Sequence, residues 1–291
     1  MVRSDACTHP RSLNERMVRQ PPHRSVLFAV FLSRLTENRK SEIAISKKWR
    51  KHRLIPKKVH YIWLGGGQKS TLTELCINSW KRVLRDYEIH EWNESNLDIR
   101  QLCKEHKFLR ECMKLKLWAF ASDWLRLYIL YSEGGIYLDT DIEVLKSYDE
   151  LLDNRMFVGL EDNDYIGTGV IGAEPGNPTI KRLLDFYEHE IWNVDFINNP
   201  IIFKYLRDLE PEEFDSCLVL SREVLSPYVP SREYKGTVET NNTLSIHWYS
   251  QNWNMSRRGY VFTTTKHISN PFVKACVSLK KNLGYELRKL Q

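Results

Sequence analysis

The sequence predicts an α/β fold in which most strands of a central sheet run parallel. From residue 54 onward, segments with strand-like alternation alternate with segments of helical spacing, which is the pattern of βα units. The 291 residues are 42% hydrophobic and 12% aromatic, enough to bury a sizeable core. We expect one large domain over residues 51–291, preceded by a basic, irregular extension over residues 1–50.

The N-terminal segment is strongly basic, with 15 Lys and Arg against 4 Asp and Glu in residues 1–60. Such a segment can contact an anionic membrane surface. It lacks interleaved aromatic residues that could stack on bases, so we do not expect nucleic-acid binding. The apolar run at residues 26–32 is too short to span a bilayer and has no signal-peptide pattern. The six cysteines show no zinc-ligand spacing and most lie in apolar patterns, so we expect a reduced, cytoplasmic protein. The basic N-terminal segment would hold it at the inner face of the membrane.

The first elements of the domain follow from alternation and capping. Residues 58–64 alternate as a strand, and the three glycines at 65–67 end it. Thr71 and Glu74 form a capping-box pattern for a helix that we expect to continue to Arg85. A second strand is predicted over residues 87–92.

The central segment predicts a helix, a glycine stop and an acid-bearing strand. Residues 113–131 are apolar at helical spacing, and the glycine pair at 134–135 supplies the left-handed stop. A strand from residue 136 to 144 would place Tyr137, Asp139 and Asp141 on one face, opposite an apolar, β-branched face.

The remainder of the chain predicts further elements of both kinds. Asn177 and Pro178 are typical of a helix start. The segments expected after the acidic strand are a strand at 168–173, helices at 178–192 and 199–209, a strand at 243–249, a loop to about 259, and a basic amphipathic helix from 271, weakened at Gly284.

The two carboxylates of Asp139 and Asp141 converge where the strand ends. Like charges at that distance repel unless a proton or a cation lies between them, and a hard divalent metal is a natural occupant. Asp123 and Arg126, three residues apart, share one face of the preceding helix. Transfer of a sugar from a nucleotide diphosphate requires stabilisation of the leaving diphosphate, which a metal on Asp141 and the Arg126 guanidinium could supply.

The same residues fit other kinds of structure and activity less well. A bare Asp-x-Asp is common in surface turns, and Asp123 with Arg126 could be an ordinary intrahelical pair. A phosphatase of the haloacid dehalogenase type expects Thr or Val at position 143, where this chain has Glu. Residues 65–70 lack the spacing of a phosphate-binding P-loop.

Three motifs together resemble glycosyltransferase family 32. They are Val59-His60-Tyr61-Ile62-Trp63-Leu64-Gly65-Gly66, then Ser122-Asp123-x-x-Arg126, then Gly134-Gly135-Ile136-Tyr137-Leu138-Asp139-Thr140-Asp141. The family includes bacterial capsule and lipopolysaccharide sugar transferases and yeast Golgi mannosyltransferases, and the catalytic core of clostridial glucosylating toxins is similar. The resemblance covers about residues 54–255. It implies a GT-A fold, a nucleotide-diphosphate sugar donor, manganese or magnesium, and transfer of a hexose with retention at the anomeric carbon.

The resemblance also assigns roles to residues in these motifs. Trp63 would stack on the nucleotide base. Asp123 and Arg126 would hold the donor sugar, and Tyr137 and Asp139 would hold the ribose and the sugar. Of these, Asp123, Arg126 and Asp139 are expected, with Asp141, to take part in catalysis.

The metal ligands are expected from two distant parts of the chain. The resemblance makes Asp141 a metal ligand, and it makes His247 a ligand of the metal or the diphosphate. Trp253 would donate its indole N–H to a phosphate. Trp248 stands where the family often has a second His, and Asn252 stands where Ser is common; an Asn carbonyl can still bind a hard cation.

The sequence therefore predicts a glycosyltransferase that moves a hexose, with UDP-hexose favoured, to a glycan or lipid-linked glycan in cell-surface polysaccharide synthesis. Two alternatives remain open. One is an effector that glycosylates a protein, and the other is a non-catalytic carbohydrate-binding protein with the same fold.

Overall fold

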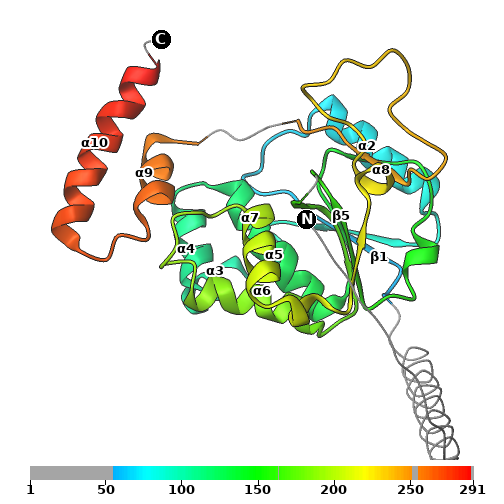
Figure 1. The fold of residues 1–291 in the computed structure, drawn as a ribbon, viewed down its shortest axis with the longest axis horizontal. Coiled ribbons are helices and arrows are strands. Elements are labelled where there is room, and N and C mark those ends of the chain that lie inside the picture. The colour runs from blue at the N-terminus through cyan, green and yellow to red at the C-terminus, as the bar shows by residue number, and fades with distance from the viewer. Residues whose placement is uncertain (1–54, 163, 251–254, 290–291) are drawn as a thin grey trace, which may run out of the picture. The chain divides into compact units, whose positions relative to one another are not determined.

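The computed structural model describes residues 55–162, 164–250 and 255–289. The predicted extension at 1–50 lies outside these residues, so the domain division at residue 50 stays a prediction. A six-stranded sheet in the order β2-β1-β3-β6-β5-β7 forms the centre (Figure 1). Its strands are β1 (Lys58–Ile62), β2 (Glu88–Trp92), β3 (Gly135–Leu138), β5 (Met156–Leu160), β6 (Ile166–Ala173) and β7 (Cys217–Leu220).

The direction of these strands confirms the predicted fold class. β1 pairs in parallel with both β2 and β3, and β5 pairs in parallel with β7. Among the described strands of this sheet, β6 alone runs antiparallel to its neighbours, β3 and β5. The sheet is therefore mixed and mostly parallel, as expected for a GT-A fold.

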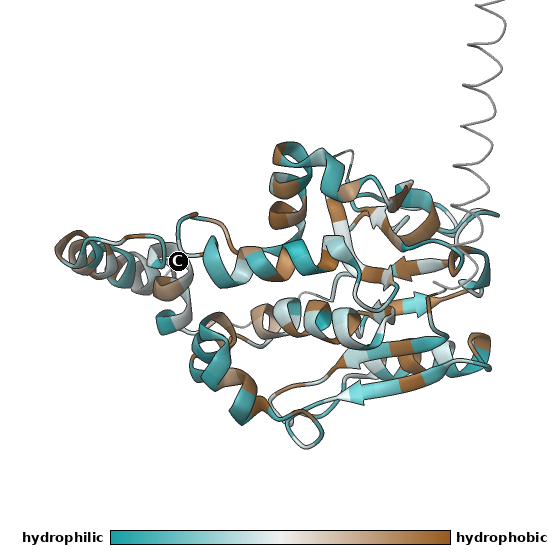
Figure 2. Ribbon diagram, turned by 90° about the horizontal axis from the view of Figure 1, so that it is seen from below, coloured by the Kyte–Doolittle hydropathy of each residue, from teal (hydrophilic) through white to brown (hydrophobic). Residues whose placement is uncertain are grey.

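Helices cover the sheet because its strands are apolar on both faces. The helices are α2 (Thr71–Val83), α3 (Ile99–Glu105), α4 (Lys107–Lys114), α5 (Trp118–Glu133), α6 (Pro178–His189), α7 (Asn199–Leu209), α8 (Arg222–Leu225), α9 (Arg257–Thr265) and α10 (Pro271–Lys289). One buried cluster joins Tyr137 of β3 to α5, α6 and α7, and the other joins Ile136 and Leu138 to α2 and α8. Hydrophilic and hydrophobic residues share most of these helices (Figure 2), as expected for helices packed on one side.

A second, two-stranded sheet brings a late segment beside the acidic motif. β4 (Ile142–Val144) pairs antiparallel with β8 (Ser245–His247), and Ile142 lies opposite His247. β4 is fixed from the other side, because Trp80 of α2 donates its indole N–H to the carbonyl oxygen of Ile142 at 2.7 Å.

Several sequence predictions about helix ends need correction. The predicted helix over 113–131 is two helices, α4 and α5, because the chain turns at residues 115–117, where Lys116 has a left-handed φ of 56°. Ser70, rather than Thr71, caps α2, since its hydroxyl accepts a bond from Thr73 N. Gly134 ends α5 with φ 63°, as predicted, and a side chain there would collide with Pro175.

The predicted strand from 136 to 144 is also wrong in one respect. β3 ends at Leu138, and Asp139, Thr140 and Asp141 form a turn before β4 joins the second sheet. Strands β5 and β7 and helices α3, α8 and α9 were not predicted. The helices predicted at 178 and 199 begin at those residues, the first of them at the Asn177-Pro178 signal. Within the described residues, every helix is too short or too polar to pass through a lipid bilayer.

Candidate active site

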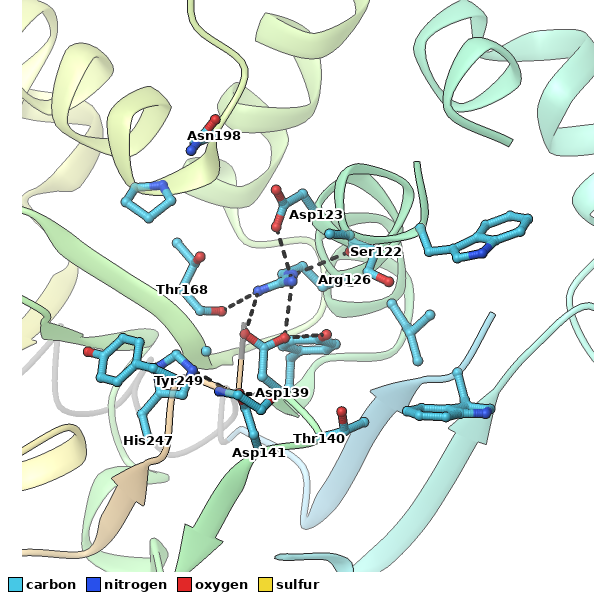
Figure 3. Close-up of a pocket in the computed structure, with 18 of the residues that line it drawn as sticks. Ser122, Asp123, Arg126, Asp139, Thr140, Asp141, Thr168, Asn198, His247 and Tyr249 are labelled. Carbon is cyan, nitrogen blue, oxygen red and sulfur yellow. Dashed lines mark hydrogen bonds and ion pairs between the residues drawn. The ribbon is translucent and has the colours of Figure 1, made fainter. Parts of the chain in front are cut away.

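A cavity of about 410 Å³ opens where β1 and β3 end, at the carboxyl edge of the parallel strands. This is the usual position of ligand sites in open α/β sheets. Figure 3 shows that side chains from α5, the turn after β3, and the segment after β8 point into it. The lining includes Trp63, Trp118, Ser122, Asp123, Arg126, Tyr137, Asp139, Asp141, Glu161, Asn198, His247, Tyr249 and Ser250.

Arg126 joins the two predicted acidic groups. Its guanidinium lies 3.0 Å from Oδ1 of Asp123 and 3.1 Å from Oδ1 of Asp139, and it donates to the carbonyl oxygen of Thr168 at 2.6 Å. Arg126 is 4% exposed, and a charge buried to this extent requires such partners. It also lies 4.4 Å from the centre of the Tyr137 ring, within cation–π distance.

Asp123 carries a carboxylate oxygen that the fold leaves without a partner. Oδ1 faces Arg126, but the buried Oδ2 has no hydrogen-bond partner among the described residues. Burial raises the pKa of Asp123 to about 6, even though Arg126 acts in the opposite direction. Such an atom destabilises the folded chain on its own and is well suited to accept a bond from a hydroxyl group of a bound molecule.

Asp139 is oriented by its neighbours, and a small residue faces it. Tyr137 donates its hydroxyl to Oδ1 of Asp139 at 2.8 Å. At Gly169, an added Cβ would lie 3.2 Å from Oδ2 of Asp139 and 3.3 Å from the His247 ring. Glycine therefore keeps the space between these two side chains open.

Asp141 and His247 meet across the second sheet. The distance from Oδ1 of Asp141 to Nε2 of His247 is 3.3 Å, and Ser250 donates its N–H (2.8 Å) and its hydroxyl (2.9 Å) to Oδ2. Burial alone would raise the pKa of Asp141, but the bonds from His247 and Ser250 outweigh it and lower the pKa to about 2. Asp141 is therefore an anion at neutral pH.

These residues fit a divalent cation. Asp139, Asp141 and His247 each offer one ligand atom, and all three atoms lie within 4.8 Å of one another. Two ligands on neighbouring octahedral positions at about 2.1 Å from an ion would be about 3 Å apart, close to the separation of the Asp141 and His247 atoms. The third predicted ligand, Asn252, lies outside the described residues, as does Trp253, so both assignments stay predictions.

Trp63 also lines the cavity and follows β1 directly. Its indole N–H donates to the carbonyl oxygen of Gly67 at 2.7 Å, and Lys69 Nζ lies 5.4 Å from the ring centre. Trp118, at the start of α5, packs against Gly65 so closely that a Cβ there would lie 2.7 Å from its Nε1. Gly65 has φ 84°, so both its conformation and this contact require glycine.

Several lining residues were not predicted from the sequence. Trp118 sits in an apolar run, where an aromatic residue has no distinguishing pattern. Tyr249 has a left-handed φ of 49°, and its ring stacks on that of His247 at 3.9 Å. Glu161 follows β5, and burial raises its pKa. The one local signal among these residues is the acidic cluster that begins at Glu161, because several carboxylates close together suggest an exposed or ligand-facing turn.

Part of the chain is similar in sequence to known glycosyltransferases. Residues 70–158 match the model of the glycosyltransferase sugar-binding region containing the DXD motif. An uncharacterized glycosyltransferase of Acanthamoeba polyphaga mimivirus is 30% identical over 134 residues, which are 43% of this chain and 52% of the relative. Inositol phosphoceramide mannosyltransferase 3 of Schizosaccharomyces pombe is 26% identical over 133 residues, 45% of this chain and 36% of the relative. The chain thus spans about half or less of the length of these relatives.

Among solved structures, the PaToxG glycosyltransferase is similar with a TM-score of 0.45 at 22% identity, over 61% of this chain and 80% of that one. The matched segment at 70–158 contains Asp123, Arg126, Asp139 and Asp141, the four residues that converge in the cavity. Residues 70–158 thus match a glycosyltransferase sugar-binding region, and the DXD motif of that region is present here as Asp139-Thr140-Asp141.

Proposed function

We propose that the protein transfers a hexose from a nucleotide diphosphate, with UDP favoured, to a hydroxyl group of a glycan acceptor. The observation that carries the proposal is the unpartnered, buried Oδ2 of Asp123 beside Arg126 in the cavity. The Asp123 carboxylate can accept hydrogen bonds from sugar hydroxyl groups, and the Arg126 guanidinium beside it is a fixed positive charge. Together they suit a polyhydroxylated ligand that also carries negative charge.

Two groups of lining residues suit two parts of the donor, the base and the diphosphate. Trp63 and Trp118 offer aromatic surface for a base, and base–aromatic stacking is worth about 1–3 kcal/mol. Asp141 and His247, with Asp139 beside them, would hold Mn²⁺ or Mg²⁺. When bound, that cation would neutralise the charge that develops on the leaving diphosphate.

A third group of lining residues, Asp123 and Arg126, suits the sugar. Asp123 would accept from its hydroxyl groups, and Arg126 would orient it while remaining paired with Asp139. Arg126 is already fixed by several contacts, so the group requires little reorganisation when the donor binds. Transfer with retention at the anomeric carbon is part of this proposal and is supported by the family resemblance.

Glu161 and Tyr249 border the same cavity and would face the acceptor. The relative from Schizosaccharomyces pombe is named as a mannosyltransferase of inositol phosphoceramide, which supports a hexose donor and a lipid-linked acceptor. We propose that the acceptor is a glycan or lipid-linked glycan used in cell-surface polysaccharides, at the cytoplasmic face of the membrane. Modification of a protein acceptor is the second candidate.

A nucleotide-release assay tests the proposal. UDP-glucose, UDP-galactose, their N-acetyl forms and GDP-mannose are each incubated with the protein and with Mn²⁺, Mg²⁺ or EDTA. Metal-dependent release from one donor, even by slow hydrolysis, is expected and would exclude a non-catalytic sugar-binding protein. Absence of release from every donor, with a mixture of glycan acceptors also present, would contradict the proposal.

A further inference from the structure

Helix α10 exposes an apolar stripe along one side. Phe272, Leu279 and Leu283 are 76%, 64% and 62% exposed, and Cys276 is also exposed. The spacings of four, three and four residues place all four side chains on one face of an α-helix. Exposed apolar residues of this size are ordinary when scattered, but a continuous stripe indicates a surface that is covered in use.

The opposite side of α10 packs against α9. The Tyr285 ring lies 5.7 Å from the Tyr260 ring, and the Tyr285 hydroxyl donates to the carbonyl oxygen of Met255 at 3.0 Å. Lys281 Nζ lies 5.9 Å from the centre of the Tyr260 ring. The helix is thus held through aromatic and polar side chains, while its most apolar residues point away from the contact.

Helix α9 is in turn fixed to the main part of the domain. Lys266, which is buried, donates to the carbonyl oxygens of Ile191 and Val194, both at 2.6 Å. The Phe262 ring lies 6.2 Å from the Trp192 ring, in an edge-to-face arrangement. The stripe on α10 therefore belongs to a supported helix, and Figure 2 shows hydrophobic and hydrophilic residues side by side along it.

The charge of this region is opposite in sign to that of the rest of the domain. Residues 251–291 contain 8 Lys and Arg and a single acidic residue, Glu286, whereas residues 61–250 contain 20 Lys and Arg against 32 Asp and Glu. Among the described residues, no carboxylate lies within ion-pair distance of Lys274, Lys280 or Lys281 of α10. The partner of this surface should therefore be anionic as well as apolar.

We propose that α10 inserts its apolar stripe into the surface of an anionic lipid bilayer. An amphipathic helix with a basic polar side binds in this way, its apolar face entering the boundary between headgroups and acyl chains. A second copy of the chain would bring two basic helices together, which like-charge repulsion opposes. A nucleic acid would attract the lysines but would leave the stripe exposed. The proposal does not depend on the donor site.

Co-sedimentation with vesicles tests the proposal on the full chain. The protein is mixed with phosphatidylcholine vesicles and with vesicles containing about 30% phosphatidylglycerol, in about 0.1 M and about 0.5 M NaCl, which differ in how far they screen surface charge. We expect at least tenfold stronger binding to the anionic vesicles, with weaker binding at the higher salt concentration. The double variant Leu279→Ser with Leu283→Ser should lose at least tenfold in the vesicle partition coefficient.

A matched control separates the stripe from general surface hydrophobicity. Leu75 and Leu209 are 62% and 57% exposed on α2 and α7, so the double variant Leu75→Ser with Leu209→Ser removes similar apolar area elsewhere. This control should bind vesicles like the parent, and both double variants should release nucleotide from a soluble donor at the parent rate. Equal vesicle binding by the Leu279/Leu283 variant and the parent would overturn the proposal. So would a parent that dimerises through the stripe, by light scattering, and does not bind vesicles.

Discussion

Replacement of Asp123 by Asn tests the role of the unpartnered oxygen. The amide keeps the size of the side chain, and its carbonyl can still accept a bond from Arg126, while the backbone carbonyl of Asp123 continues to accept from Asn199. A hydrogen bond from a hydroxyl to a charged acceptor is worth about 1.5–3 kcal/mol. Because about 1.4 kcal/mol corresponds to a factor of ten in rate, we expect kcat/KM to fall by about 10- to 150-fold.

The pH dependence distinguishes this role from a merely structural one. Burial raises the pKa of Asp123 to about 6, so below that pH the protonated carboxyl becomes a poorer acceptor. The parent should therefore lose kcat/KM as the pH falls through about 6, and Asp123→Asn should lack this acidic limb.

The free energy of unfolding should change with pH in the opposite direction to kcat/KM. Between the ordinary carboxyl pKa of 3.8 and about 6, the folded protein holds the proton more tightly than the unfolded chain. The contribution of this residue to the unfolding free energy then falls as pH rises.

The measurements are initial rates of nucleotide release at varied donor concentration across the pKa of Asp123, with thermal unfolding of both proteins at each pH. The exposed Asp153, changed to Asn, serves as the control and should leave both measurements unchanged. An Asp123→Asn protein with parental kcat/KM at neutral pH would refute the reasoning, because the buried oxygen would then have no ligand to bind.

Three further predictions concern other parts of the molecule. Asp141→Asn should reduce Mn²⁺-dependent nucleotide release by at least about 100-fold, the usual loss when one transition-state contact is removed. It should also weaken Mn²⁺ binding measured by calorimetry, whereas Asp153→Asn should change neither quantity. Trp63→Leu should weaken UDP binding by about 5- to 150-fold if stacking is worth about 1–3 kcal/mol, and an unchanged Kd would contradict that role. Lys266→Met should lower the unfolding free energy by about 1–3 kcal/mol, since the buried carbonyl of Ile191 and the part-buried carbonyl of Val194 lose their donor. Burial lowers the pKa of Lys266 to about 8, so between about pH 8 and 10.5 the unfolded chain binds this proton more tightly than the folded protein. The parent's unfolding free energy should therefore rise with pH in this range, and the variant should lack this rise in denaturant titrations.

Local signals in the sequence identified much of the fold and most of the acidic site. The Asn177-Pro178 start of α6 and the glycine stop of α5 depend on neighbouring residues, so they can be recognised without tertiary information. The pairing of Asp123 with Arg126 was likewise visible, because three residues separate them on one helix.

Features created by distant contacts were harder to predict. The turn at Asp139–Asp141 looked like a continuous strand, because nothing local shows that β4 leaves the main sheet to pair with β8. Trp118 is held in the cavity lining by its packing on Gly65, and Tyr249 is held there by its stacking on His247. No periodicity marks either residue, so only the folded chain reveals them.

The pairing of β4 with β8 makes cation binding a report on tertiary assembly. Asp141 immediately precedes β4, while His247 ends β8 and Ser250 follows it, so the two sides of the pair come from segments more than one hundred residues apart. An ion bound to residues of both segments would stabilise the β4–β8 pairing. By thermodynamic linkage, the pairing would strengthen ion binding by the same free energy. Added Mn²⁺ should therefore slow hydrogen exchange at the amides of β8, and a weakened β4–β8 pair should lower affinity for the ion without any change to its ligands.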